Sequence, residues 1–237
     1  MTGGSINRIF LTALLAGAFA GLVLASIQQF TVVPMILEAE TYETAAGASH
    51  SHGHGHDDHG GAAAGDEAWA PQEGTERSFY TFVNSVIAGI GFALLLAACY
   101  AIQKNVNWRN GVLWGLGGFA AFHLAPSLGL PPELPGAAAA ELGARQEWWL
   151  LTVVLTAGGL LLLAFVSGAI RWLGLALIVV PHLLGAPQPE SHGGLAPAEL
   201  ANAFIYTSLL TDAIFWVVLG VASALLYRRF GRTASAV

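Results

Sequence analysis

Long apolar runs separated by short polar or charged segments dominate the chain. In order, these runs cover residues 9–30, 79–102, 111 to about 128, 148 to about 168, 172–186 and 203–227. An apolar helix of roughly 20 residues can cross a hydrocarbon layer about 30 Å thick. The pattern therefore predicts an all-α fold, a polytopic membrane helix bundle with six transmembrane helices.

The fifth run is short and contains Pro181, so a bundle of five spans is the alternative. Six spans place seven of the nine Lys and Arg residues on one side, leaving Arg77 and Arg145 opposite. The positive-inside rule then makes that side cytoplasmic and puts both termini there. A cleaved signal peptide is the other interpretation of the first run, but this run is long for one, and we expect a retained helix.

Composition supports a membrane protein. The chain is 55% hydrophobic and 10% charged, with a mean hydropathy of +0.61, whereas roughly 25% charged residues are usual in soluble domains. Its single cysteine, Cys99, lies in an apolar run, which excludes a disulfide framework. No phosphate-binding loop, dinucleotide fingerprint, hydrolase motif or basic nucleic-acid patch is present. We predict that the chain is not an enzyme and binds no nucleic acid.

Residues 31–78 separate the first two runs and are predicted to form an outer loop within a single membrane domain, 1–237. This segment is rich in side chains that can bind metals: His50, His52, His54, His56, His59, Glu38 and Glu40. Imidazole and carboxylate groups suit Co²⁺, Ni²⁺, Zn²⁺ or Cu²⁺. The loop is therefore predicted to collect metal. The alternative is a solvated linker, because a Gly/Ser/His tract has no apolar residues with which to fold.

Two histidines and one aspartate fall inside apolar runs: His123, His182 and Asp212. A helical rise of about 1.5 Å per residue places them in one layer, a little outside the membrane midplane. Such groups are costly in lipid and often mark a pathway, although each could instead be satisfied by internal hydrogen bonds. Pro126 and Pro181 lie nearby, and interrupted helices lining a cavity are where transporters place cation sites. The sequence thus predicts a metal site built from all three residues.

The outer segments between the later runs are also distinctive. Residues 128–136 contain three prolines, and residues 145–149 contain two tryptophans. Such segments predict a structured outer vestibule. The segment 185–194 adds His192 to the same face as a further candidate ligand. We assign the other Trp and Tyr residues to the interface belt of the membrane.

Several motifs together resemble one known family. They are AG-x-x-AGL in the first run, VVPMILEAETYE, the His-rich segment, GGFAAFHLAPSLGLPPELPG, RQEWWLLT, VVPHLLGAP and FWVVLG. In combination they resemble the CbtA family of cobalt transporter subunits, over most of the chain. The resemblance implies cobalt uptake across a bacterial cytoplasmic membrane, alongside a small one-helix partner, CbtB, with histidines of its own. The family is usually described with five spans.

The resulting hypothesis is that the outer loop concentrates Co²⁺ and passes it to His123, His182 and Asp212. Mixed nitrogen and oxygen ligation does not exclude Ni²⁺ or Zn²⁺. One alternative is a membrane haem or electron-transfer protein with His123 and His182 as axial ligands. Another is a metal-binding accessory subunit that does not itself transport. The sequence leaves open whether the chain forms a homo-oligomer.

Overall fold

The computed structural model describes residues 3–50, 74–103, 105–190 and 193–233 of the chain. Within these ranges the regular structure is helical, and the β contact found there is an isolated bridge between Ala137 and Gly194. The elements are α1 (Gly3–His50), α2 (Thr75–Ile102), α3 (Trp108–Phe119), the π-helical turn η1 (Ala120–Leu124), α4 (Ala125–Ser127), α5 (Leu142–Phe165), the 3₁₀ turn η2 (Ala169–Trp172), α6 (Leu173–Leu184) and α7 (Ala198–Thr233). The predicted all-α fold is confirmed.

Helices lie at all six apolar runs of the sequence. Among the described residues, α1, α2, α5 and α7 each contain a segment long and apolar enough to cross a membrane. The third run is divided among α3, η1 and α4, and the fifth forms a shorter apolar stretch, Ala169–Leu184. Large apolar side chains such as Phe10, Leu113 and Leu183 lie exposed on the surface. An apolar surface of this kind marks a membrane-embedded bundle.

Helix α1 is much longer than the apolar run that predicted it. The expected loop, 31–78, is wrong in its first part, because the helix continues to His50. With 48 residues, α1 is about 72 Å long, more than twice a hydrocarbon core of about 30 Å. Its extension contains four alanines and three glutamates, residue types that favour helix. A small apolar cluster holds the extension: Val32, Ala39, Leu134 and Phe204.

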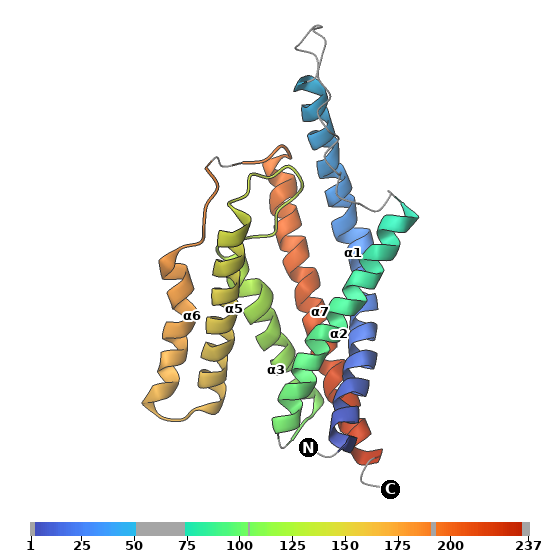
Figure 1. The fold of residues 1–237 in the computed structure, drawn as a ribbon, viewed down its shortest axis with the longest axis vertical. Helices are drawn as coiled ribbons and strands as arrows, with labels where there is room; N and C mark the ends of the chain where they lie inside the picture. Colours follow the sequence, from blue (N-terminus) through green and yellow to red (C-terminus); the bar gives the residue numbers. More distant parts are fainter. Residues whose placement is uncertain (1–2, 51–73, 104, 191–192, 234–237) are drawn as a thin grey trace, which may run out of the picture.

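Helices α1, α2 and α7 pack around a common core, on the right of Figure 1. The contact of α1 with α2 uses small residues spaced by four, all of them buried: Ala13, Gly17, Gly21 and Ala25. A Cβ atom on Gly17 or Gly21 would collide with the backbone of α2. The absence of side chains at these glycines therefore lets α1 and α2 approach closely, as small residues do in membrane helix pairs.

Helix α3 crosses α7 at a contact made largely of glycine. A Cβ atom on Gly111 would collide with the carbonyl group of Gly220, and one on Gly115 would collide with the carbonyl group of Trp216. Gly118, one turn further along, lies against the indole ring of Trp216. Because these glycines have no side chains, Trp216 can pack closely against α3.

A π-helical turn, η1, follows α3 and widens the helix. The N–H of Ala125 donates to the carbonyl of Ala120, five residues earlier. Pro126 comes next and has no N–H, so it cannot donate to the carbonyl of Phe122. Single π turns inside helices are frequent at functional sites. The histidine of the third run, His123, lies in this turn.

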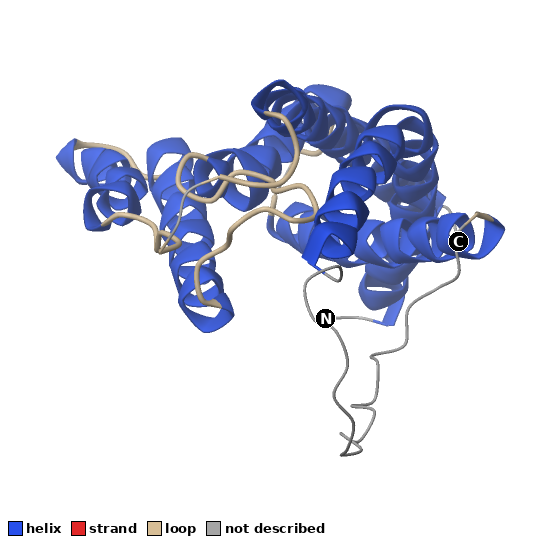
Figure 2. Cartoon of the chain, turned by 90° about the horizontal axis from the view of Figure 1, so that it is seen from above, coloured by secondary structure: helices blue, strands red, loops and turns tan. Residues whose placement is uncertain are grey.

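Helices α5 and α6 form a hairpin beside α3, as Figures 1 and 2 show from two directions.

At the N-terminus of α5, the carboxylate of Glu141 caps the helix by accepting hydrogen bonds from the N–H groups of Gly143 (2.8 Å) and Ala144 (2.7 Å). These two donors lower the pKa of Glu141. The cap fixes the point at which the proline-rich loop enters the helix.

The beginning of α1 and the end of α7 meet at the same end of the bundle (Figure 1). The Nε of Arg8 donates to the backbone carbonyl of Tyr227 at 2.6 Å, and its guanidinium lies 3.6 Å from the centre of the Tyr227 ring. Two termini on one side agree with an even number of crossings. That this side faces the cytoplasm stays a prediction from the charge distribution.

Candidate functional site

Two of the predicted site residues, His123 and Asp212, meet inside the bundle. His123 comes from the η1 turn and Asp212 from α7. Their closest atoms, Nε2 of His123 and Oδ2 of Asp212, are 3.7 Å apart. The two side chains keep exposed fractions of 27% and 18%. They are therefore neither sealed in the core nor fully exposed, which is the position expected of groups that face a cavity.

A cavity of about 390 Å³ reaches this pair. Its lining combines the η1 turn, α4, the proline-rich loop, the first turns of α5 and the first half of α7: Phe122, His123, Pro126, Ser127, Leu130, Pro131, Pro132, Glu133, Leu142, Arg145, Gln146, Trp149, Leu209 and Asp212. The two segments predicted to form an outer vestibule, 128–136 and 145–149, thus line the same cavity as the His–Asp pair. We call this cavity the vestibule.

An ion pair forms part of the lining of the vestibule. Arg145 of α5 donates from Nη2 to Oε2 of Glu133 in the proline-rich loop, at 2.7 Å. Both side chains are more than a quarter exposed, so solvent screens the pair strongly. The pair links the loop to α5, and it places one carboxylate in the lining besides Asp212.

Trp216 holds His123 from the side away from Asp212. Its indole Nε1–H donates to Nδ1 of His123 at 3.0 Å. The Trp216 side chain is only 1% exposed, and its ring stacks on Phe122 with centres 5.6 Å apart. Phe119 and Phe92 also pack near the imidazole. One histidine nitrogen is therefore bound to the bundle core, while the other faces Asp212.

His182 does not join this pair. It lies in α6 against the ring of Trp148, with ring centres 5.9 Å apart, and it is absent from the lining of the vestibule. Across the described residues, no group of three or more His, Cys, Asp or Glu side chains is placed to hold one metal ion. The structure thus brings two of the three predicted ligands together, while His182 lies elsewhere because α6 packs mainly on α5. A haem held between His123 and His182 would need both rings to face one cavity, and His182 is not among the residues that line the vestibule.

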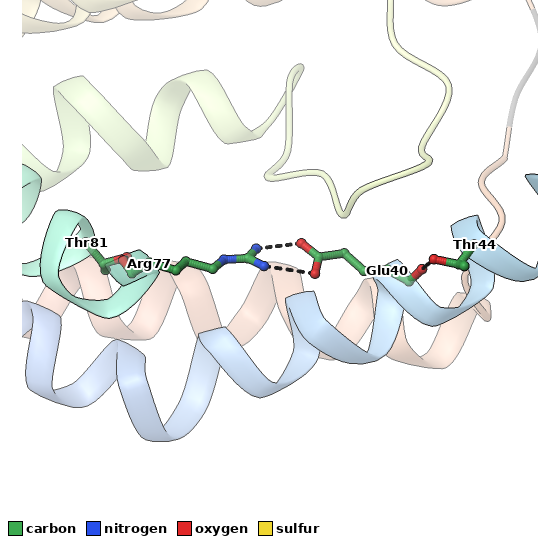
Figure 3. Close-up of polar contacts among 4 residues, drawn as sticks. All are labelled: Glu40, Thr44, Arg77 and Thr81. Atoms are coloured by element: carbon green, nitrogen blue, oxygen red, sulfur yellow. Dashed lines mark hydrogen bonds and ion pairs between the residues drawn. The ribbon is translucent and has the colours of Figure 1, made fainter. Parts of the chain in front are cut away.

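The two acidic candidates on α1 differ in their surroundings. Glu38 is exposed. Both carboxylate oxygens of Glu40 instead accept hydrogen bonds from Arg77 of α2, at 2.9 and 2.5 Å, as Figure 3 shows. When a guanidinium group binds both oxygens of a carboxylate, it neutralises the negative charge and fixes the orientation of the side chain. Glu40 therefore connects the extension of α1 to the start of α2.

We expect Glu40→Gln to weaken the contact between α1 and α2 by less than about 1 kcal/mol, because the pair is partly exposed. The free energy of unfolding of Glu40→Gln, Arg77→Met and the double variant would give the coupling energy by a double-mutant cycle. Cobalt uptake should stay within about twofold of the unmodified chain. A drop of about tenfold in uptake with unchanged stability would show that Glu40 handles the ion itself.

The remaining metal-binding candidates lie at the limits of the described structure. The backbone of His50 ends α1. His52, His54, His56, His59 and His192 lie outside the described residues. Their role stays a prediction from composition.

Trp216 is the residue of the site that the sequence interpretation missed. It was assigned with the other aromatic residues to the membrane interface, which is wrong because it lies buried between α3 and α7. A sequence signal did exist. Trp216 follows Asp212 by four residues, so the two side chains share one face of a helix.

The fold and the cavity define the chain as a polytopic helical membrane protein with a polar, partly exposed His–Asp pair inside its bundle. The family model described as "Probable cobalt transporter subunit (CbtA)" matches residues 6–228. The chain belongs to the CbtA family, as its motifs indicated. No curated protein and no solved structure matched it.

Proposed function

We propose that this chain takes up Co²⁺ across the bacterial cytoplasmic membrane by way of the vestibule and the His123–Asp212 pair. Membership of a cobalt transporter subunit family supports cobalt as the ion. The observation that carries the proposed route is that one cavity is lined by an intramembrane histidine, an intramembrane carboxylate and the two outer segments. Polar groups placed this way within apolar helices commonly serve an ion pathway.

The geometry of the pair suits a borderline divalent ion. Nitrogen and oxygen ligands lie about 2.1 Å from metals of this kind, so Nε2 of His123 and Oδ2 of Asp212, 3.7 Å apart, are close enough to share one ion. Only two protein ligands leave most of the coordination shell to water or a further ligand. An ion held in this way can leave again, which transport requires. The ligand set does not exclude Ni²⁺ or Zn²⁺.

The outer histidines have the collecting role in this proposal. His50, His52, His54, His56 and His59, with Glu38 and His192, would raise the local concentration of Co²⁺ near the vestibule. The charge distribution along the sequence supports an outer position for them, with both termini in the cytoplasm.

Because members of the family are described as subunits of a transporter, a partner is implied. We propose a one-helix, CbtB-like partner, and assembly of the chain into a homo-oligomer is compatible with this arrangement.

The two intramembrane histidines provide a matched test. We expect His123→Ala to lower the initial rate of radioactive cobalt uptake by more than about tenfold, because a ligand is lost. His182→Ala should keep the rate within about twofold, because its ring lies outside the vestibule. The variants should replace the chromosomal copy in the native cell, so that any partner is present, and membrane levels should be compared by immunoblot. Equal loss of uptake in both variants, or in neither, would contradict the proposed route.

A further inference from the structure

A second cavity lies on the other side of the aromatic residues that border the vestibule. Its volume is about 590 Å³, and it is lined by residues of α2, α3, η1, α5 and α7. Most of its lining is apolar, with Gln103 and Asn110 among the polar exceptions. The lining includes Cys99, the single cysteine of the chain. We call this space the inner cavity.

Two aromatic side chains, Phe122 and Trp216, lie where the vestibule and the inner cavity adjoin. Phe122 lines both spaces, while Trp216 lines only the inner cavity and His123 only the vestibule. The rings of Phe122 and Trp216 are stacked, with an interplanar angle of 19°. Gly118 lets the indole lie directly against α3, since a Cβ atom there would collide with the ring. We call Phe122 and Trp216 the aromatic barrier.

The hydrogen bond between Trp216 and His123 decides which state of the imidazole is present. An indole nitrogen can only donate, so Nδ1 of His123 must accept and carries no proton. In the neutral ring the proton is then on Nε2, the nitrogen that faces Asp212. A histidine binds metal only through an unprotonated nitrogen. In this arrangement neither nitrogen is available to a cation.

Ligation by either nitrogen is therefore incompatible with the Trp216 bond. Binding through Nδ1 requires the lone pair that the indole N–H occupies. Binding through Nε2 moves the ring proton to Nδ1, where it would face another donor hydrogen. In both cases the indole must leave its present position. The indole is also one half of the aromatic barrier, so cation binding and the position of the barrier are linked.

We propose that Trp216 is a positioning residue that holds His123 in a cation-free state and keeps the aromatic barrier closed. Entry of Co²⁺ into the vestibule breaks the Trp216–His123 hydrogen bond, releases the indole and connects the vestibule to the inner cavity. This inference rests on the proposed function and names how ion binding leads to passage.

The affinity for Co²⁺ tests the competition directly. Calorimetry should use the full purified chain with the five histidines of the outer tract replaced by serine, so that their binding does not mask the site. Trp216→Phe keeps an aromatic ring and removes the donor, and we expect about three- to tenfold tighter binding because no hydrogen bond has to be broken. Trp114→Phe is the matched control, since its indole donates to Gln103 and not to His123. Its affinity should be unchanged. Equal or weaker binding by Trp216→Phe would overturn the inference.

Cys99 reports on the barrier without any change to Trp216. A membrane-impermeant methanethiosulfonate reagent is added outside intact spheroplasts, and modification of Cys99 is measured on the purified chain by mass spectrometry. We expect Co²⁺ to raise the rate at least about fivefold in the unmodified chain but not in His123→Ala. Trp216→Phe should raise the rate without Co²⁺. An unchanged rate in a chain that binds Co²⁺ through His123 overturns the inference alone. If His123→Ala binds Co²⁺ as well as its parent, the proposed function fails, and the inference fails with it.

Discussion

A chain carrying Asp212→Asn is expected to lose cobalt uptake almost completely, by more than about 100-fold. The amide keeps the size of the side chain and an oxygen acceptor, but it removes the negative charge. A divalent ion entering a site surrounded by apolar helices loses much of its hydration. It needs an anionic partner to compensate, and removing one member of such a buried charge pair costs about 3 kcal/mol or more. Asp212 is the intramembrane carboxylate that faces His123.

Glu133→Gln is the matched control for this prediction. Glu133 also lines the vestibule, but its carboxylate is 29% exposed and paired with Arg145. Exposed charges are screened by solvent and salt, so the loss of uptake should be only about twofold and should shrink as ionic strength rises. Initial rates of radioactive cobalt uptake, normalised to membrane level, compare the two variants. Equal losses would mean that Asp212 acts only as part of a general negative field.

Gly115→Leu is expected to prevent the bundle from folding. The added Cβ would collide with the backbone carbonyl of Trp216, and a backbone atom of α7 cannot move aside as a flexible side chain would. Helices α3 and α7 would have to separate, and the buried contact of Trp216 with α3 would be lost with them. Overpacking of this kind combined with lost burial costs more than about 3 kcal/mol, a large share of typical stability.

Gly117→Leu provides the comparison on the same helix. A Cβ atom on Gly117 has no neighbour within 4 Å, and leucine favours helix over glycine by roughly 0.8 kcal/mol. The variant should therefore fold. Size-exclusion profiles of the detergent-purified chains and their thermal unfolding midpoints measure the difference. A monodisperse Gly115→Leu chain with an unchanged midpoint would contradict the close contact of α3 and α7.

The site residues show how far the sequence could lead. His123 and Asp212 were identifiable because a titratable group in a long apolar run is rare and costly. That they lie at one level of the bundle was predictable as well, since a helix rises by a constant amount per residue. The same reasoning placed His182 at the same level and therefore in the same site, but its ring does not line the vestibule. Depth is one coordinate, and two residues at one depth can lie on helices that do not touch.

Trp216 illustrates the opposite error. Tryptophan is common at membrane interfaces, so a general rule assigned it there. Gly118 leaves a space on α3 that the indole of Trp216 fills, and Gly115 lets the backbone of Trp216 approach α3; both contacts exist only once α3 and α7 are packed together. Which side chain fills a space depends on two helices at once. No pattern within a single helix contains that information.

The sequence by itself determined that the chain is an all-helical membrane protein, where its apolar helices lie, and to which family it belongs. Those properties follow from local composition and the length of apolar runs, which lipid imposes on each segment separately. Only the tertiary structure decided that Glu40 binds Arg77, and that His123 meets Asp212 and Trp216 while His182 does not. The reason is that these contacts join helices far apart in the chain, so their partners are chosen by close packing between helix surfaces and not by the properties of any one segment.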